Sequence, residues 1–304
     1  MEKKQVGAHQ IVHLVDGGYR FSDYMEQSEE LLRTYSCLSQ RQIGESVLGR
    51  PIHAWIIGEG KELLHINAAV HANEWITAPL LLRFIEGMAA EYELMQKNAH
   101  KIAVCAVPMV NPDGVDLAQN GIAKGYTDQE REQLISWNGG SSNFSRWKAN
   151  IRGVDLNDQF PAFWEEERDR RGRKGPAWQD YSGPHPLSEP EAIALVELAR
   201  KWNFSRVMSL HTQGREIYWN YREMEPQQAE VMANQLAEAG GYRAVKLSGS
   251  DAGYKDWYIQ EFRRPGFTVE AGEGVNPLPA EQFDEIYEEL SLIMGKFVLG
   301  EYAG

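Results

Sequence analysis

The motif His71-Ala72-Asn73-Glu74 places two metal-binding side-chain types three residues apart. It directly follows an apolar run at residues 62–70, which has the length of a buried strand. Catalytic zinc typically takes three protein ligands, such as two histidines and a glutamate, and keeps one position open for water. His211 is the candidate third ligand, because it follows a second apolar run at residues 206–210. Spacing alone leaves an alternative open, in which Glu74 is favoured in a first helical turn by the helix dipole and His71 is a surface histidine.

Glu270 is a charged residue within the otherwise apolar run at residues 266–271. A carboxylate on a buried strand is costly unless it is paired or takes part in chemistry. Beside a zinc ion it would be placed to take a proton from bound water, whose pKa falls towards about 7. The alternative is a glutamate on a strand face that is open to solvent.

The elements that must position these residues alternate along the chain. Hydrophobic periodicity predicts helices at residues 22–38, 77–95, 188–202, 226–239 and 283–297, and strands at 62–70, 101–110, 206–210 and 266–271. The sequence predicts a capping box at Ser188 and Glu191, a helix end at Gly240-Gly241 and a turn at residues 111–114. This pattern predicts an α/β fold with a largely parallel or mixed sheet covered on both faces. The expected ligands would meet at the carboxyl edge of that sheet, where open α/β sheets bind their ligands.

Residues 119–187 lack clear periodicity and are rich in Gly, Trp, Arg, Asn and Asp. A stretch of this length is more often a set of functional loops than unused chain. Within it, the charge run at residues 165–174 is interpreted as a solvated loop or helix end rather than a substrate clamp.

The chain has 304 residues, with 31 Lys and Arg against 44 Asp and Glu, so its formal net charge is −13. An acidic chain lacks the basic footprint of a protein that binds nucleic acid or an anionic membrane surface. Its apolar runs are shorter than the roughly 18 residues of a membrane span, and its two cysteines imply no disulfide framework. We therefore expect one domain over residues 1–304, located in the cytoplasm, with no nucleic-acid or membrane partner.

Five segments, in this order, resemble the zinc metallocarboxypeptidase family typified by carboxypeptidase A: residues 71–74, 111–114, 147–157, 209–211 and 267–270. The resemblance runs from about residue 19 to the C-terminus. It implies a single α/β domain with a mixed, roughly eight-stranded sheet flanked by helices. It also implies one zinc ion per chain on His71, Glu74 and His211, with Glu270 as general base and then general acid.

The chain departs from this family where a substrate would bind. Asp158 follows Asn157 at the point where the family's carboxypeptidases carry an arginine that grips the terminal carboxylate of the substrate. Lys148 replaces the arginine expected to stabilise the oxyanion, and it keeps the charge without the planar fork. Ser248 stands where the family has a tyrosine. Tyr254 is the nearby phenol, either a substitute for that tyrosine or a packed aromatic residue.

The run Asn-Asp-Gln-Phe-Pro at residues 157–161 is similar to one branch of the family, the bacterial γ-D-glutamyl-meso-diaminopimelate peptidases of the endopeptidase I type. This resemblance implies hydrolysis of the γ-D-glutamyl-meso-diaminopimelate bond in small peptidoglycan-derived peptides. Asn157 and Asp158 would orient the leaving diamino acid, with Asp158 binding its second ammonium group. In the alternative, Asp158 pairs with a protein cation such as Arg152 or Arg215, which are otherwise candidates for substrate carboxylates.

Some members of this branch carry LysM wall-binding modules, and the motifs here begin too early in the chain for one to precede them. We therefore expect no accessory domain and a cytoplasmic role on muropeptide fragments, in recycling or sporulation. Three alternatives remain. A carboxypeptidase acting on protein C-termini is disfavoured by Asp158, an aspartoacylase-like deacylase would act on small N-acyl amino acids, and a non-enzymatic binding module is disfavoured by the intact ligands and Glu270.

Overall fold

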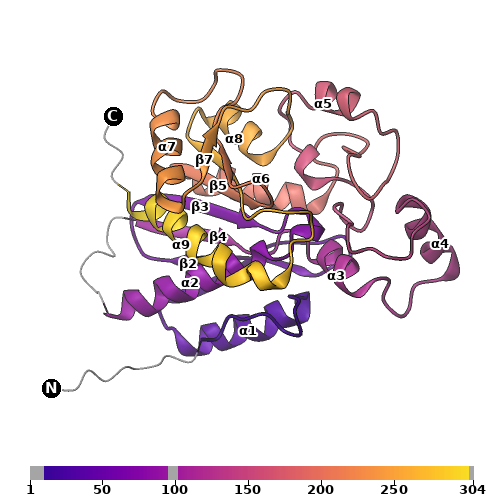
Figure 1. Cartoon of the computed structure of the whole chain (residues 1–304), viewed down its shortest axis with the longest axis horizontal. Helices are drawn as coiled ribbons and strands as arrows, with labels where there is room; N and C mark the ends of the chain where they lie inside the picture. The colour runs from indigo at the N-terminus through magenta and orange to yellow at the C-terminus, as the bar shows by residue number, and fades with distance from the viewer. Residues whose placement is uncertain (1–9, 95–101, 301–304) are drawn as a thin grey trace.

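The computed structural model describes residues 10–94 and 102–300, and an eight-stranded sheet lies at the centre of these residues (Figure 1). The strands are β1 (Leu38–Glu45), β2 (Pro51–Ile57), β3 (Glu62–Ala68), β4 (Ile102–Val107), β5 (Arg206–His211), β6 (Glu216–Tyr218), β7 (Arg243–Val245) and β8 (Gly266–Glu270). Their order across the sheet is β1-β2-β4-β3-β5-β8-β6-β7. The central strands β4, β3, β5 and β8 run parallel, and β2 and β6 join them antiparallel on either side. The expected mixed, eight-stranded α/β sheet is confirmed.

Helices cover both faces of the sheet (Figure 1). One core contains buried side chains from α1 (Phe21–Thr34), α2 (Thr77–Leu94), α7 (Ala229–Gly240) and α9 (Phe283–Leu299). The opposite core contains side chains from α6 (Pro190–Trp202) and α8 (Tyr254–Phe262). Alternate residues of each strand enter opposite cores, so Leu64 and Ile66 pack in the first while Leu63 packs against the second. This alternation explains why the strands read as continuous apolar runs.

A smaller core supports the irregular region between β4 and α6. It packs α3 (Pro112–Asn120) and α4 (Asp128–Trp137) against the loop that carries Phe144 and Trp147. The same region contains the short 3-10 helix η2 (Leu156–Asp158) and α5 (Trp164–Arg171), and is otherwise largely irregular, as expected. The remaining short helices are η1 (Ala72–Glu74) and η3 (Ala280–Gln282).

The helices and strands that periodicity indicated are present, with bounds that differ by a few residues. The first helix ends at Thr34 rather than at Leu38, because Leu38 already pairs with Ile57 in the β1–β2 ladder. Residues 95 and 101, assigned to a helix and a strand by their pattern, lie outside the described residues. No helix within residues 10–94 or 102–300 combines the length and apolar character needed to cross a bilayer.

Two local signals act differently from the sequence prediction. Asn111 begins a helix rather than a turn, because its Oδ1 accepts the Gly114 N–H at 3.0 Å and proline occupies the first turn. The predicted capping box at Ser188 is wrong, since α6 begins at Pro190 with Glu189 before it. Proline has no N–H to donate and fits the first helical position, so it sets this boundary.

Candidate metal and catalytic site

The loop after β3 carries His71 and Glu74 to the carboxyl edge of the sheet. Ala69 adopts a left-handed backbone conformation (φ 50°), and the chain then turns into η1. Thr77 holds this turn, because its hydroxyl donates to the Glu74 carbonyl (2.8 Å) and accepts from the Ala69 N–H (2.9 Å). The side chains of His71 and Glu74 therefore project from a fixed backbone.

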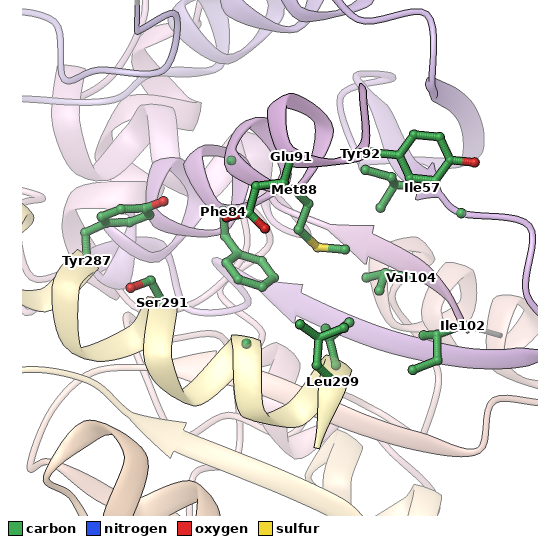
Figure 2. Close-up of a pocket in the computed structure, with 14 residues that line it drawn as sticks. Ile57, Phe84, Met88, Glu91, Tyr92, Ile102, Val104, Tyr287, Ser291 and Leu299 are labelled. Atoms are coloured by element: carbon green, nitrogen blue, oxygen red, sulfur yellow. The ribbon is translucent and has the colours of Figure 1, made fainter. Parts of the chain in front are cut away.

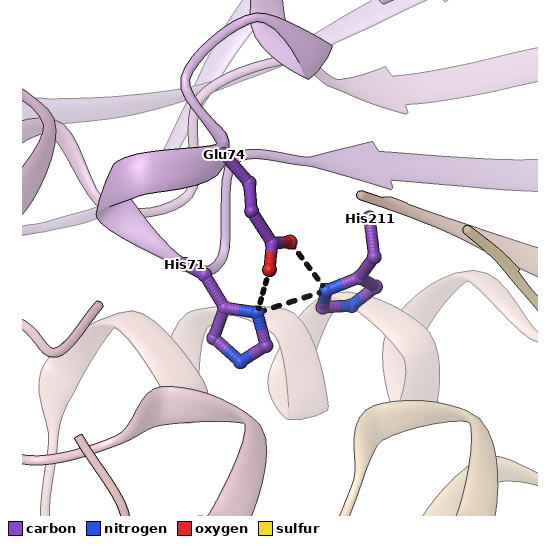
Figure 3. A group of neighbouring side chains, drawn as sticks. All are labelled: His71, Glu74 and His211. Carbon is purple, nitrogen blue, oxygen red and sulfur yellow. Dashed lines mark hydrogen bonds and ion pairs between the residues drawn. The ribbon is translucent and has the colours of Figure 1, made fainter. Parts of the chain in front are cut away.

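The three expected metal ligands lie together at this edge (Figure 3). His211 is the last residue of β5, which pairs in parallel with β3. Nδ1 of His71 lies 2.9 Å from Glu74 Oε1, Nδ1 of His211 lies 2.9 Å from Glu74 Oε2, and the two Nδ1 atoms are 3.1 Å apart. All three residues are at most 4% exposed.

This donor set fits a zinc ion. Two imidazole nitrogens and one carboxylate form the ligand set of many catalytic zinc sites, and here all three donor atoms lie within 4.8 Å of one another. Burial acts to raise the pKa of Glu74, but His71 and His211 outweigh it and hold that pKa well below its usual range. Glu74 is therefore a buried carboxylate, which is costly without a cation nearby.

Asp155 contacts His71 on the side of the imidazole ring that faces away from Glu74. Sequence analysis did not identify Asp155 as a site residue. Its Oδ1 lies 3.3 Å from His71 Nε2 and accepts the Asn157 N–H, while its Oδ2 accepts the Asp180 N–H, both at 3.2 Å. A carboxylate on the outer nitrogen fixes the imidazole so that Nδ1 faces the metal position. The only sequence signal was the place of Asp155 two residues before Asn157, within one of the family-like segments.

Glu270 ends β8 and is the direct neighbour of His211 in the β5–β8 pairing. It also lies opposite Glu216 in the antiparallel β6–β8 pairing, so these two side chains share a face of the sheet. Burial raises the pKa of Glu270 to about 7, with Glu74 and Glu216 adding to this increase and His211 and Lys148 opposing it. A carboxyl group with this pKa can take up and return a proton near neutral pH.

Lys148 is half-buried, and its ammonium group interacts electrostatically with the carboxylates of this site. Its backbone is fixed, because its N–H donates to the Trp178 carbonyl (2.9 Å) and its carbonyl accepts the Ala72 N–H (3.0 Å). Burial lowers its pKa, but Asp155, Glu74 and Glu270 outweigh burial, and the net pKa is raised. The group stays charged, and no carboxylate of the described residues pairs with it within 4.0 Å.

Asp158 is buried in an ion pair. The sequence analysis allowed for a protein cation as its partner, but that cation is neither Arg152 nor Arg215. The cation is Arg171 of α5, whose Nε lies 3.0 Å from Asp158 Oδ2 and whose Nη2 donates to Oδ1 at 3.1 Å. Burial and the charge of Asp155 raise the pKa of Asp158 well above its usual range, while the charge of Arg171 acts to lower this pKa. Asn157 precedes it in η2 and is half-buried.

Arg152 and Arg215, the cations proposed from the sequence, already have carboxylate partners. Arg152 lies 3.5 Å from Glu189 and is largely exposed. Arg215 pairs with Glu285 (2.7 Å) and Glu289 (2.6 Å) of α9.

Tyr254 is a packed aromatic residue, which is the second of the two interpretations that its place in the sequence left open. Only 1% of it is exposed, and its ring packs against Phe160 and Trp257 in the core formed with α6 and α8. Its hydroxyl has no hydrogen-bond partner within the described part of the chain. Its position at the start of α8 directs the ring inward, because α8 packs this face on the sheet.

The hollows of the described structure include the following two. An apolar cavity of about 530 Å³ is bounded by Phe84 and Met88 of α2, Val104 of β4 and Leu299 of α9 (Figure 2), and shares no residue with the ligand cluster. A second hollow, of about 410 Å³, is lined by Asn138, Ser141, Asn143, Ser145, Arg146 and Trp178. It is joined to the ligand turn by Asn73, whose amide donates to the Arg146 carbonyl at 3.3 Å.

Comparison with known proteins gives consistent matches. Residues 24–292 match the Peptidase_M14 model, described as zinc carboxypeptidase. Gamma-D-glutamyl-L-diamino acid endopeptidase 1 from Lysinibacillus sphaericus is 44% identical over 303 residues, covering 95% of this chain and 74% of that protein. Bovine thrombin-activatable fibrinolysis inhibitor aligns with a TM-score of 0.72 at 20% identity, over 92% of this chain and 95% of that one. Murein-tripeptide amidase MpaA from Escherichia coli O157 aligns with a TM-score of 0.54 at 21% identity, over 84% and 91%. The two structures share the fold.

Proposed function

The chain is a zinc metallopeptidase of the Peptidase_M14 zinc carboxypeptidase family, and from this premise we propose that it hydrolyses the γ-D-glutamyl-meso-diaminopimelate bond of peptidoglycan-derived peptides. The name of the Lysinibacillus relative, which is 44% identical over most of the chain, supports this bond as the substrate. The chemistry rests on one observation, the convergence of two imidazole Nδ1 atoms and the Glu74 carboxylate beside Glu270.

The residues divide the reaction among them. A zinc ion held by His71, Glu74 and His211 would supply Lewis-acid polarisation of the scissile carbonyl and lower the pKa of a water molecule. Glu270 takes a proton from the attacking water and later passes one to the leaving amine, as its near-neutral pKa allows. Lys148 stabilises the negative charge that develops on the carbonyl oxygen. Asp155 keeps His71 in its binding orientation.

We further propose that the enzyme acts in the cytoplasm, as one catalytic domain, on small muropeptide fragments. The two cysteines, Cys37 and Cys105, do not form a disulfide, which suits a reducing compartment. Fractionation of the source cells, with immunodetection of the protein, tests this location.

The decisive experiment offers the zinc-loaded enzyme L-alanyl-γ-D-glutamyl-meso-diaminopimelate and identifies the products by mass spectrometry. We expect L-alanyl-D-glutamate and free diaminopimelate, with much slower cleavage of the α-linked isomer. Release of C-terminal residues from ordinary peptides alone would identify a carboxypeptidase instead. Turnover of an N-acyl amino acid alone would identify a deacylase, and binding without turnover would identify a binding module.

A further inference from the structure

Arg171 reaches from the end of α5 back to η2. Besides the two contacts with Asp158, its Nε lies 2.7 Å from Glu167 and its Nη1 lies 3.0 Å from Asp180. The sequence indicated that the charge run at residues 165–174 is solvated. The structure differs at Arg171, because its guanidinium contacts the buried carboxylates of Asp158 and Glu167.

Asp180 connects this arginine to the catalytic centre. Its backbone N–H donates to Asp155 Oδ2 (3.2 Å), and the other oxygen of Asp155 lies 3.3 Å from His71 Nε2. One buried side chain, that of Asp155, thus separates the backbone of Asp180 from the candidate ligand His71, and Arg171 contacts the Asp180 side chain.

Both charged groups keep unused bonding capacity and access to solvent. A guanidinium has five N–H donors, and the described partners of Arg171 leave N–H groups on both terminal nitrogens free. The Asp180 carboxylate accepts from Arg171 and Gln179, which leaves further lone pairs. The side chains of Arg171 and Asp180 are 32% and 24% exposed.

We propose that Arg171 and Asp180 bind the free amino-acid centre of the leaving diamino acid, Arg171 its carboxylate and Asp180 its ammonium group. This assignment rests on the proposed function. Opposite charges 3.0 Å apart match a head group that carries both of its charges on one carbon atom. Asp158 is then a positioning residue that fixes the guanidinium, and it does not itself bind the ammonium group.

The other candidate cations are less well placed for this role. Arg215 is held by carboxylates of α9, and Arg152 by Glu189. Lys148 is a point charge in the electrostatic field of Asp155, Glu74 and Glu270, and it cannot form the paired, planar contact that a carboxylate takes from an arginine.

The test compares two substrates that differ only in this carboxylate, γ-D-glutamyl-meso-diaminopimelate and γ-D-glutamyl-L-lysine. Arg171→Gln should lower kcat/KM about 10- to 100-fold for the diaminopimelate substrate and less than about threefold for the lysine substrate. Asp180→Asn should lower both by about tenfold, because both substrates carry the ammonium group. Arg168→Gln is the matched control, since Arg168 lies on the same helix and pairs with the exposed Asp169.

Arg171→Lys controls for a folding defect. It keeps a positive charge beside Asp158 and loses only the planar guanidinium that can donate two parallel hydrogen bonds to a carboxylate. It should show the same selective loss. Equal losses on both substrates in the two Arg171 variants would overturn the proposal and make Arg171 purely structural.

Calorimetric titration with free meso-diaminopimelate and with L-lysine tests the site independently of the bond cleaved. Tighter binding of diaminopimelate that disappears in Arg171→Gln supports the site even if neither peptide is hydrolysed, in which case the proposed function alone fails. Equal affinities for the two amino acids would overturn the site.

Discussion

Replacing Asp155 by asparagine would remove one charge from the site while keeping the size of the side chain. Asp155 is fully buried, and its two oxygens face His71 Nε2 and the backbone N–H groups of Asn157 and Asp180. Burial acts to raise its pKa, but His71 and Lys148 hold that pKa well below its usual range. Asp155 is therefore ionised at any pH at which the enzyme works, and Asp155→Asn removes a full negative charge.

The expected cost falls on metal affinity. Losing the carboxylate behind a ligating histidine typically weakens metal binding about 10- to 100-fold, which corresponds to about 1.4 to 2.7 kcal/mol. We expect the upper part of this range for two reasons. A buried charge is poorly screened by salt. The three groups that face Asp155 are hydrogen-bond donors, so the NH₂ of an asparagine would meet another donor there. Once zinc is saturating, much of the activity should return.

Competition with a chromophoric chelator measures the zinc Kd of Asp155→Asn against the wild type. Asp113→Asn is the matched control, because Asp113 is equally buried but pairs with Arg50, at 3.5 Å, and contacts no ligand. A zinc Kd within about twofold of wild type, in a folded Asp155→Asn protein, would refute the idea that this carboxylate orients His71.

Three further changes test the remaining assignments. His211→Ala should abolish zinc retention and turnover, and a variant that kept stoichiometric zinc by atomic absorption would exclude His211 as a ligand. Glu270→Gln should keep zinc while kcat falls by at least about 10²-fold, whereas a kcat close to wild type would assign the proton transfer to another group. Burial raises the pKa of Glu191 from 4.5 to about 7, so the stability it contributes is complete below pH 4.5 and is lost as pH rises to about 7. Glu191→Gln should therefore raise the free energy of unfolding at pH 8 by up to about 3 kcal/mol relative to wild type, and urea denaturation showing no gain would contradict a protonated Glu191.

Elements with long apolar stripes could be predicted from the sequence, and those with short or polar patterns could not. The continuous apolar runs before His71 and His211 identify buried parallel strands, because both faces of such strands are covered. β6 and β7 have three residues each, too few to show a period. α5 is dominated by charged residues, so its helical structure depends on capping charges and tertiary contacts rather than on an apolar stripe.

The ligand residues could be nominated because metal chemistry restricts residue type and because parallel strands end at a common edge. Asp155 could not, since an aspartate two residues before an asparagine is an ordinary turn residue until the fold places His71 against it. The burial of Tyr254 follows equally from tertiary packing, because an aromatic residue at a helix start has no fixed direction in the sequence.

The ion pair between Asp158 of η2 and Arg171 shows why substrate specificity is harder to predict from the sequence than the type of reaction. Asp158 read alone is an anion that attracts an ammonium group, yet the structure neutralises it with Arg171 from a segment that reads as solvent-exposed. The sign of the charge offered to a ligand is therefore set by the pair and not by either residue. A buried carboxylate recruits a cation because leaving it unpaired is costly, and a partly exposed arginine so recruited retains donors for a second anion. The recognition that we propose thus depends on a contact between residues 13 positions apart, which only the docking of α5 creates.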